Sequence, residues 1–185
     1  NTSEINWHIR KQETIDEFVE IRRNPNHLEW AYFDVSRIHF SADINAVVEQ
    51  SDLLVLAIPS PYLKQSLNDI TVDMSPKMAL SAVKGMIPDE NLLVTEYLHK
   101  YFNVPNENLG VIAGPCHAEE IALERLSYLT VGCENMDKAR EWSKLFDTPY
   151  VRTTPSNDIE GLEYASVMKN IYAIAAGICK SLHYG

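Results

Sequence analysis

Two lysines stand where an ammonium group could hold an anion or move a proton. The first, Lys84, ends an apolar stretch and is followed by Gly85. Ligands of open α/β sheets gather beyond the carboxyl ends of the strands, so an ammonium group at a strand exit would face a bound anion. Ordinary surface lysines also occur at strand exits, and this position alone leaves both interpretations open.

The second lysine, Lys169, lies in the middle of a mostly apolar stretch. Its neighbours at helical spacing are small, namely Ala165, Ser166, Ala173 and Ala176. We expect that face to leave room for a ligand and to remove Lys169 from water, which would favour loss of its proton and allow acid or base chemistry. The alternative is a structural lysine paired with Glu163.

A Gly-Pro turn separates an apolar run from a predicted helix within residues 111–120. Gly114 permits close approach of the backbone to a ligand, and the first amides of the helix are free to donate hydrogen bonds. A helix start without chemistry is the alternative. Cys116 and His117 are poor candidates for a nucleophilic dyad, because adjacent helical side chains point about 100° apart and no third group orients the imidazole.

Arg10 and Lys11 stand at the end of the first predicted strand. In dinucleotide-binding domains the strand in this place ends beside the adenosine ribose, where an acidic residue favours NAD and a basic residue accommodates the 2′-phosphate of NADP. The two basic residues therefore favour NADP, or tolerance of both cofactors.

Short apolar runs alternate with longer amphipathic stretches, which indicates an α/β fold: a partial, Rossmann-like doubly wound sheet that is largely parallel. We expect strands over residues 4–10, 37–40, 52–58, 78–84, 109–113, 127–132 and 149–152. We expect helices over residues 12–23, 43–50, 60–68, 90–102, 116–125 and 136–146. The continuous apolar run 52–58 is typical of a strand buried on both faces.

The composition changes from residue 157, where apolar residues surround a stretch that ends near Tyr184. Such a helix must be buried, and we expect it to open an all-α substrate domain. Residues 154–157 supply turn and capping chemistry before it. We therefore predict a cofactor domain over 1–155 and the start of a substrate domain over 156–185.

Composition narrows the classes of partner. With 26 acidic and 16 basic side chains, the formal charge of −10 disfavours nucleic acid and anionic membranes as partners. Three scattered cysteines are too few for a disulfide framework or a zinc site, and we expect no metal. No apolar run reaches the roughly 20 residues needed to span a bilayer. Asn1-Thr2-Ser3-Glu4 does not look like a signal peptide, so we expect a cytoplasmic protein.

Taken in order, the candidate segments resemble the bacterial NAD(P)-dependent glycerol-3-phosphate dehydrogenase family over essentially the whole chain. The segments that carry the resemblance are Leu56-Ala57-Ile58-Pro59-Ser60, Val83-Lys84-Gly85, residues 113–120, Gly161-Leu162-Glu163 and residues 168–177. The resemblance implies reversible hydride transfer between NAD(P)H and dihydroxyacetone phosphate, giving sn-glycerol 3-phosphate for phospholipid synthesis. A homodimer is compatible with it, and the sequence leaves the oligomeric state open.

The resemblance also implies a role for each matching residue. Lys169 would exchange a proton with the C2 oxygen of the substrate, and Lys84 would contact substrate and cofactor. The remaining expected contacts are Gly114 and Cys116 for the substrate, and Arg10, Lys11, Ser60, Tyr62 and Ala118 for NAD or NADP.

Departures from the family pattern qualify these expectations. The family usually has Ser or Thr at Cys116 and Phe at His117, and a thiol is the weaker hydrogen-bond donor. The first strand, the GxGxxG turn with its helix, and the C-terminal phosphate-binding segment are missing, so we expect this chain alone to be inactive. The alternatives are a related β-hydroxyacid or ketopantoate dehydrogenase, and a non-catalytic α/β binding module.

Overall fold

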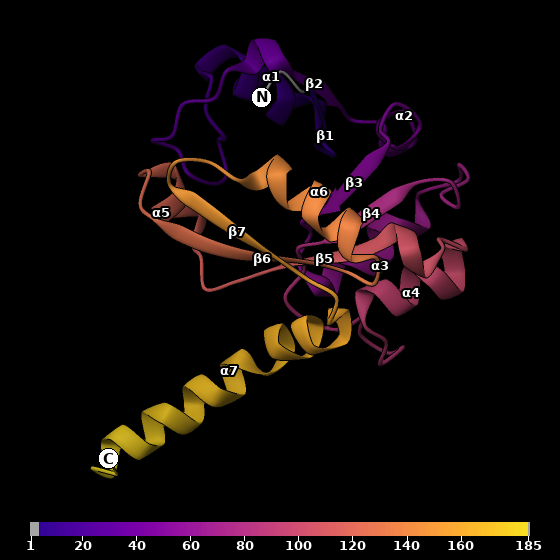
Figure 1. Cartoon of the computed structure of the whole chain (residues 1–185). Helices are drawn as coiled ribbons and strands as arrows, with labels where there is room; N and C mark the ends of the chain where they lie inside the picture. The colour runs from indigo at the N-terminus through magenta and orange to yellow at the C-terminus, as the bar shows by residue number, and fades with distance from the viewer. Residues whose placement is uncertain (1–3, 185) are drawn as a thin grey trace.

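The computed structural model describes residues 4–184 as an α/β fold with two sheets (Figure 1). The small sheet pairs β1 (Ile5–His8) with β2 (Ile38–Ser41) in parallel. The larger sheet has the order β3 (Leu53–Leu56), β4 (Met78–Ser81), β5 (Leu109–Ala113), β6 (Ser127–Cys133) and β7 (Val151–Ser156). Strands β3, β4 and β5 are parallel, whereas β6 runs antiparallel to β5 and parallel to β7. The predicted fold class is confirmed, and each of the seven predicted strands overlaps an observed one, although β1, β3 and β4 are shorter than predicted and β7 begins and ends later.

Within residues 4–184, six α-helices connect the strands and a seventh follows β7: α1 (Gln12–Ile21), α2 (Ile44–Glu49), α3 (Ser60–Asn68), α4 (Val94–Phe102), α5 (Ala118–Ala122), α6 (Met136–Phe146) and, last, α7 (Ile159–Ser181). Several begin at side chains that accept hydrogen bonds from free amides of the first turn. Asp43 accepts from Asn45 and Ala46 at the start of α2, and Asn135 does the same for α6. The predicted helices over 60–68 and 136–146 are confirmed at both ends.

The capping residue of α7 differs from the prediction. Residues 154–156 continue β7, where Pro155 is tolerated because β7 is the edge strand and pairs only with β6. The helix is capped instead by Asp158, whose carboxylate accepts a hydrogen bond of 2.9 Å from the Gly161 amide. The predicted boundary between 1–155 and 156–185 stays a prediction.

Helices cover both faces of the larger sheet, which makes it doubly wound. Neighbouring residues of β4 serve opposite faces, because successive strand side chains alternate. Ala79 joins the core formed with α3 and α4, and Leu80 joins the core formed with Trp142 of α6. The small sheet packs against α1 through a separate aromatic cluster, which consists of Trp7, Phe18, Phe33 and Phe40.

Strand β3 is less buried than its apolar sequence predicted. Val55 is 47% exposed, and only Leu56 of this strand is fully buried. The strand lies at the edge of the larger sheet and pairs only with β4 among residues 4–184. The prediction of a strand buried on both faces is therefore wrong, because nothing in the described chain covers Val55.

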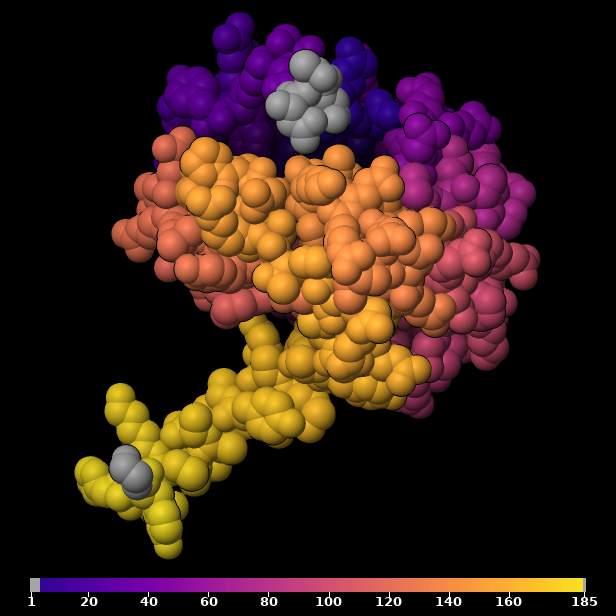
Figure 2. All heavy atoms as spheres, viewed as in Figure 1, coloured from indigo at the N-terminus to yellow at the C-terminus, as the bar shows by residue number. Residues whose placement is uncertain are grey.

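Helix α7 projects away from the rest of the molecule (Figures 1 and 2). Its first turns are packed, with Ile159 and Glu163 buried, whereas every residue from Met168 to Tyr184 is exposed. A side chain at Gly177 would meet no atom within 4 Å. The prediction of a fully buried helix is wrong for this structure, since burial of an apolar helix needs a partner surface that residues 4–184 do not supply.

The described helices are too short or too polar to cross a membrane. Residues 1–3, which belong to the stretch compared with a signal peptide, and residue 185 lie outside the described residues.

Candidate functional site

Three of the predicted site segments leave the sheet at one edge. Strands β3, β4 and β5 are parallel neighbours, with Leu56 opposite Ser81 and Ser81 opposite Val111. The residues that follow their carboxyl ends include Ser60, Lys84 and Gly114. Parallel strands have their carboxyl ends on the same side of the sheet. The structure therefore brings these segments together at the carboxyl-terminal edge of the larger sheet, where ligands of open α/β sheets bind.

Gly85 allows the segment after β4 to lie directly against the start of α3. Its φ of +146° lies in the region that side chains rarely adopt, and an added Cβ would stand 2.6 Å from Oγ of Ser60. A residue with a side chain would therefore push the Lys84-Gly85 segment away from Ser60. This close approach explains the glycine and places Ser60 beside the backbone that carries Lys84.

Gly114 lies directly against the backbone of β6. Its φ is +154°, and an added Cβ would lie closer than 3.0 Å to the carbonyl oxygen of Tyr128 on β6. The space that a side chain would need is therefore filled by protein backbone. The structure itself explains why glycine stands here, and the substrate contact expected of Gly114 stays a prediction.

The charged and polar candidates at this edge are accessible. Lys84 is exposed, and its ammonium makes no hydrogen bond or ion pair with residues 4–184. Cys116 is half-buried, and Ala118 is the exposed first residue of α5. Tyr62, on the first turn of α3, is 58% exposed. These side chains are free to meet a ligand.

Lys169 lies in a different environment from the one predicted. It stands on the exposed part of α7, so the removal from water that we expected is not found in the described chain. The alternative partner, Glu163, does not bond to Lys169 either. Its carboxylate accepts hydrogen bonds from the amides of Val94 and Thr95 at the start of α4, at 3.1 and 3.3 Å.

Glu163 is a buried acid that reasoning from the sequence treated only as a possible partner of Lys169. Burial raises the pKa of its carboxyl, while hydrogen bonds from the Thr95 side chain and from the amides of Thr95 and Val94 partly offset that increase. The available signal was its spacing, because Glu163 stands four residues from both Ile159 and Val167 and therefore shares a helix face with apolar residues.

Arg10 and Lys11 follow the carboxyl end of β1, as predicted, and both are exposed. Arg10 lines a pocket of about 340 Å³. The other lining residues are His8, Ala42, Asp43, Ile44, Asn45, Ser66 and Asp69. Burial lowers the pKa of His8, which favours its neutral form, although a backbone hydrogen bond with Ala42 acts in the opposite direction. Within the described residues, the Arg10 guanidinium makes no ion pair and is available to a phosphate group.

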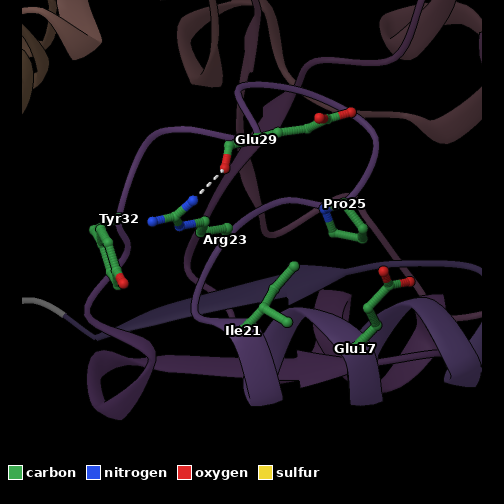
Figure 3. A pocket seen from close by; sticks show the side chains of 6 residues that line it. All are labelled: Glu17, Ile21, Arg23, Pro25, Glu29 and Tyr32. Carbon is green, nitrogen blue, oxygen red and sulfur yellow. Dashed lines mark hydrogen bonds between the residues drawn. The ribbon is translucent and has the colours of Figure 1, made fainter.

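A larger pocket of about 510 Å³ lies elsewhere, against α1 and the segment that follows it (Figure 3). Arg23 crosses it, donating a hydrogen bond of 3.3 Å to the carbonyl oxygen of Glu29 and lying 4.4 Å from the centre of the Tyr32 ring. The predicted site residues do not line this pocket. No cluster of three or more possible metal ligands occurs within residues 4–184.

Comparison with known proteins gives matches along most of the chain. A family model described as the NAD-dependent glycerol-3-phosphate dehydrogenase N-terminus matches residues 1–139. The model of the C-terminus of the same family matches residues 158–185.

Curated relatives and solved structures agree with these matches. The NAD(P)+ glycerol-3-phosphate dehydrogenase of Oceanobacillus iheyensis is 30% identical over 97% of this chain and 52% of its own length. The NAD(P)+ glycerol-3-phosphate dehydrogenase 1 of Salinibacter ruber is 31% identical over 95% of this chain and 52% of its own length. The structure of the Plasmodium falciparum glycerol-3-phosphate dehydrogenase superposes with a TM-score of 0.85 at 27% identity, covering 98% of this chain and 52% of that one. The chain spans about half the length of the curated relatives it matches.

Proposed function

Because the chain belongs to the NAD-dependent glycerol-3-phosphate dehydrogenase family, we propose that it forms the cofactor side and the first substrate helix of an enzyme that reduces dihydroxyacetone phosphate to sn-glycerol 3-phosphate. The main structural support is the common edge at which Ser60, Lys84 and Gly114 follow β3, β4 and β5. A ligand at that edge would meet an unpaired ammonium group and a half-buried thiol.

The proposed chemistry divides between two lysines. When bound, NAD(P)H supplies the hydride that C2 of the substrate accepts. Lys169 donates a proton to the C2 oxygen in the reducing direction and accepts it in the reverse direction. Lys84 contacts substrate and cofactor and stabilises negative charge that develops on that oxygen. We also propose that Gly114 and Cys116 line the substrate.

The described residues fit part of a dinucleotide. Arg10 and Lys11 are exposed cations at the end of β1, where the adenosine phosphate would lie. At the other end of the cofactor, Ser60, Tyr62, Lys84 and Ala118 would lie near the nicotinamide half. A glycine-rich turn for the pyrophosphate does not occur within residues 4–184. Either NAD or NADP is compatible with this partial site.

Lys169 needs a covered environment for this role. In the described chain its helix face is open to water. We propose that, in an enzyme of the family's length, further residues pack on α7 and exclude water from Lys169. An ammonium group in such surroundings loses its proton more easily, as the reverse reaction requires.

We further propose a cytoplasmic enzyme whose product feeds phospholipid synthesis, with a phosphorylated small molecule as its partner. The formal charge of −10 argues against nucleic acid and anionic lipid surfaces as partners. A homodimer is compatible with this proposal.

A substrate panel tests the proposed function. The chain would be expressed alone and with the coding sequence on either side of it, and oxidation of NADH and NADPH would be followed with dihydroxyacetone phosphate or 2-ketopantoate. We expect the extended protein to use dihydroxyacetone phosphate and the 185-residue chain to be inactive. Preference for 2-ketopantoate would instead identify the related dehydrogenase class, and no turnover of either substrate would favour a non-catalytic module.

A further inference from the structure

The side chain of Glu163 joins two helices that are far apart in the sequence. It is 4% exposed, and its Oε1 atom accepts hydrogen bonds from the amides of Val94 and Thr95. Its Oε2 atom accepts a further bond from the hydroxyl of Thr95. The first amides of a helix have no partner within the helix and form its positive end, so a carboxylate is well suited to this place.

We propose that Glu163 is a positioning residue, whose attachment to the start of α4 sets the direction in which α7 leaves the sheet and thereby places Lys169 relative to Lys84. The proposal rests on the function proposed above. Its geometric basis is that α4 is the next helix after Lys84 and begins ten residues later, at Val94, so the Glu163 side chain ties the end of the connection that carries Lys84 to α7.

A small change in the direction of α7 moves Lys169 by a large distance, because Lys169 lies well beyond Glu163 on the helix. Lys169 follows Glu163 by six residues, which is about 9 Å along a helix axis. A tilt of roughly 10° about Glu163 would therefore move the backbone of Lys169 by about 1.5 Å. Displacements of about 1 Å in a reacting group can cost about 100-fold in rate.

The other contacts of the first turns of α7 restrict the direction of the helix less than the hydrogen bonds of Glu163 do. Leu162 packs against Gly132, where an added Cβ would stand 2.6 Å from Cδ1 of Leu162, and Ile159 is buried nearby. Apolar contacts of this kind are non-directional, whereas hydrogen bonds depend on angle. The nearby acid Glu96 is already engaged, because it accepts a bond of 2.8 Å from the Leu93 amide.

Five variants separate positioning from simple packing. Glu163→Ala removes all three bonds, whereas Glu163→Gln keeps an acceptor for the two amides and offers an N–H to the Thr95 hydroxyl. Thr95→Val removes the hydroxyl with little change of shape, and Thr95→Ser keeps it. Glu160→Ala, at an exposed acid on the first turn of α7, is the matched control.

The first measurement is hydrogen exchange of the Val94 and Thr95 amides in the 185-residue chain, which needs no activity. We expect faster exchange in Glu163→Ala, with Glu163→Gln and Glu160→Ala close to the wild type. Wild-type exchange in a folded Glu163→Ala variant would overturn the attachment. If that variant does not fold, Glu163→Leu takes its place, because leucine keeps most of the apolar packing and offers no acceptor to the two amides, and wild-type exchange in Glu163→Leu would overturn the attachment.

The second measurement is steady-state kinetics with dihydroxyacetone phosphate in the extended protein. We expect kcat to fall about 100-fold in Glu163→Ala with little change in KM, and to fall less in Thr95→Val. Glu163→Gln and Thr95→Ser should keep a kcat close to that of the wild type. An increase in KM at unchanged kcat would overturn positioning. Lack of turnover by the wild type would overturn the proposed function and the role toward Lys169, while the exchange result would still decide the attachment.

Discussion

Replacement of Gly114 by alanine would force a methyl group into the backbone of β6. The φ of +154° at this residue is one that side chains rarely adopt. The new Cβ would also lie closer than 3.0 Å to the Tyr128 carbonyl oxygen and 3.1 Å from Cα of Leu129. Neither neighbour can move freely, because Tyr128 and Leu129 pair with β7, and the next residue of β6, Thr130, pairs with Ala113 of β5.

Two costs add to give the expected loss of stability. A residue held in such an unfavourable backbone region costs about 1–3 kcal/mol. The clash of the new methyl group with the backbone of β6 costs about 1–3 kcal/mol more, although Gly114 itself is exposed. We therefore expect Gly114→Ala to lower the free energy of unfolding by about 4 kcal/mol, a large part of the roughly 5–15 kcal/mol typical of a domain.

Urea denaturation of the 185-residue chain, followed by circular dichroism, measures this loss. With a slope of about 2 kcal/mol per M, a loss of about 4 kcal/mol lowers the midpoint by about 2 M. Gly177→Ala is the matched control, because its methyl group would meet no atom within 4 Å and alanine is the better helix former. A Gly114→Ala midpoint equal to that of the wild type, or an equal fall in Gly177→Ala, would refute the packing argument.

Three further outcomes follow from the structure. Asn45→Ala should lower the free energy of unfolding by about 1–2 kcal/mol, because the Asn45 side chain accepts a hydrogen bond of 2.7 Å from the Thr71 amide and donates one of 3.1 Å to the Asp69 carbonyl. An unchanged midpoint of urea denaturation would contradict this. Burial raises the pKa of Glu163 above its ordinary 4.5, so the stability that its protonated form contributes is present at low pH and is lost as the pH rises through the raised pKa. Urea curves over a range of pH should therefore show Glu163→Gln gaining stability relative to the wild type as the pH rises, and a constant difference would count against this. Hydrogen exchange in the 185-residue chain should be fast from Met168 to Tyr184, since an unsupported helix of this length is marginal in water; protection equal to that of α4 would show that another surface covers it.

The local elements were largely predictable from the sequence. The alternation of apolar runs and amphipathic stretches gave the strands and helices, and turn residues marked the ends of 60–68 and 136–146. The antiparallel direction of β6 was not predicted. Strand direction depends on which pairing the whole sheet permits, and the alternation of side chains is the same in both directions.

The site was predictable only where a general rule of the fold applies. Lys84 and Gly114 could be expected at one edge because both follow strands of a parallel sheet. The surroundings of Lys169 could not, because burial of an apolar helix depends on a partner surface beyond its own sequence. The bond between Glu163 and Thr95 spans 68 residues, and neither residue type signals such a pairing.

In the proposed enzyme, Lys169 moves the proton that accompanies hydride transfer. The most direct test of this role compares Lys169→Ala with Lys180→Ala, an exposed lysine of the same helix, in the extended protein. With dihydroxyacetone phosphate and reduced cofactor, we predict a fall in kcat of about 10²–10⁴-fold for Lys169→Ala and no change for Lys180→Ala. A folded Lys169→Ala enzyme that retains the wild-type kcat would show that Lys169 does not move the proton.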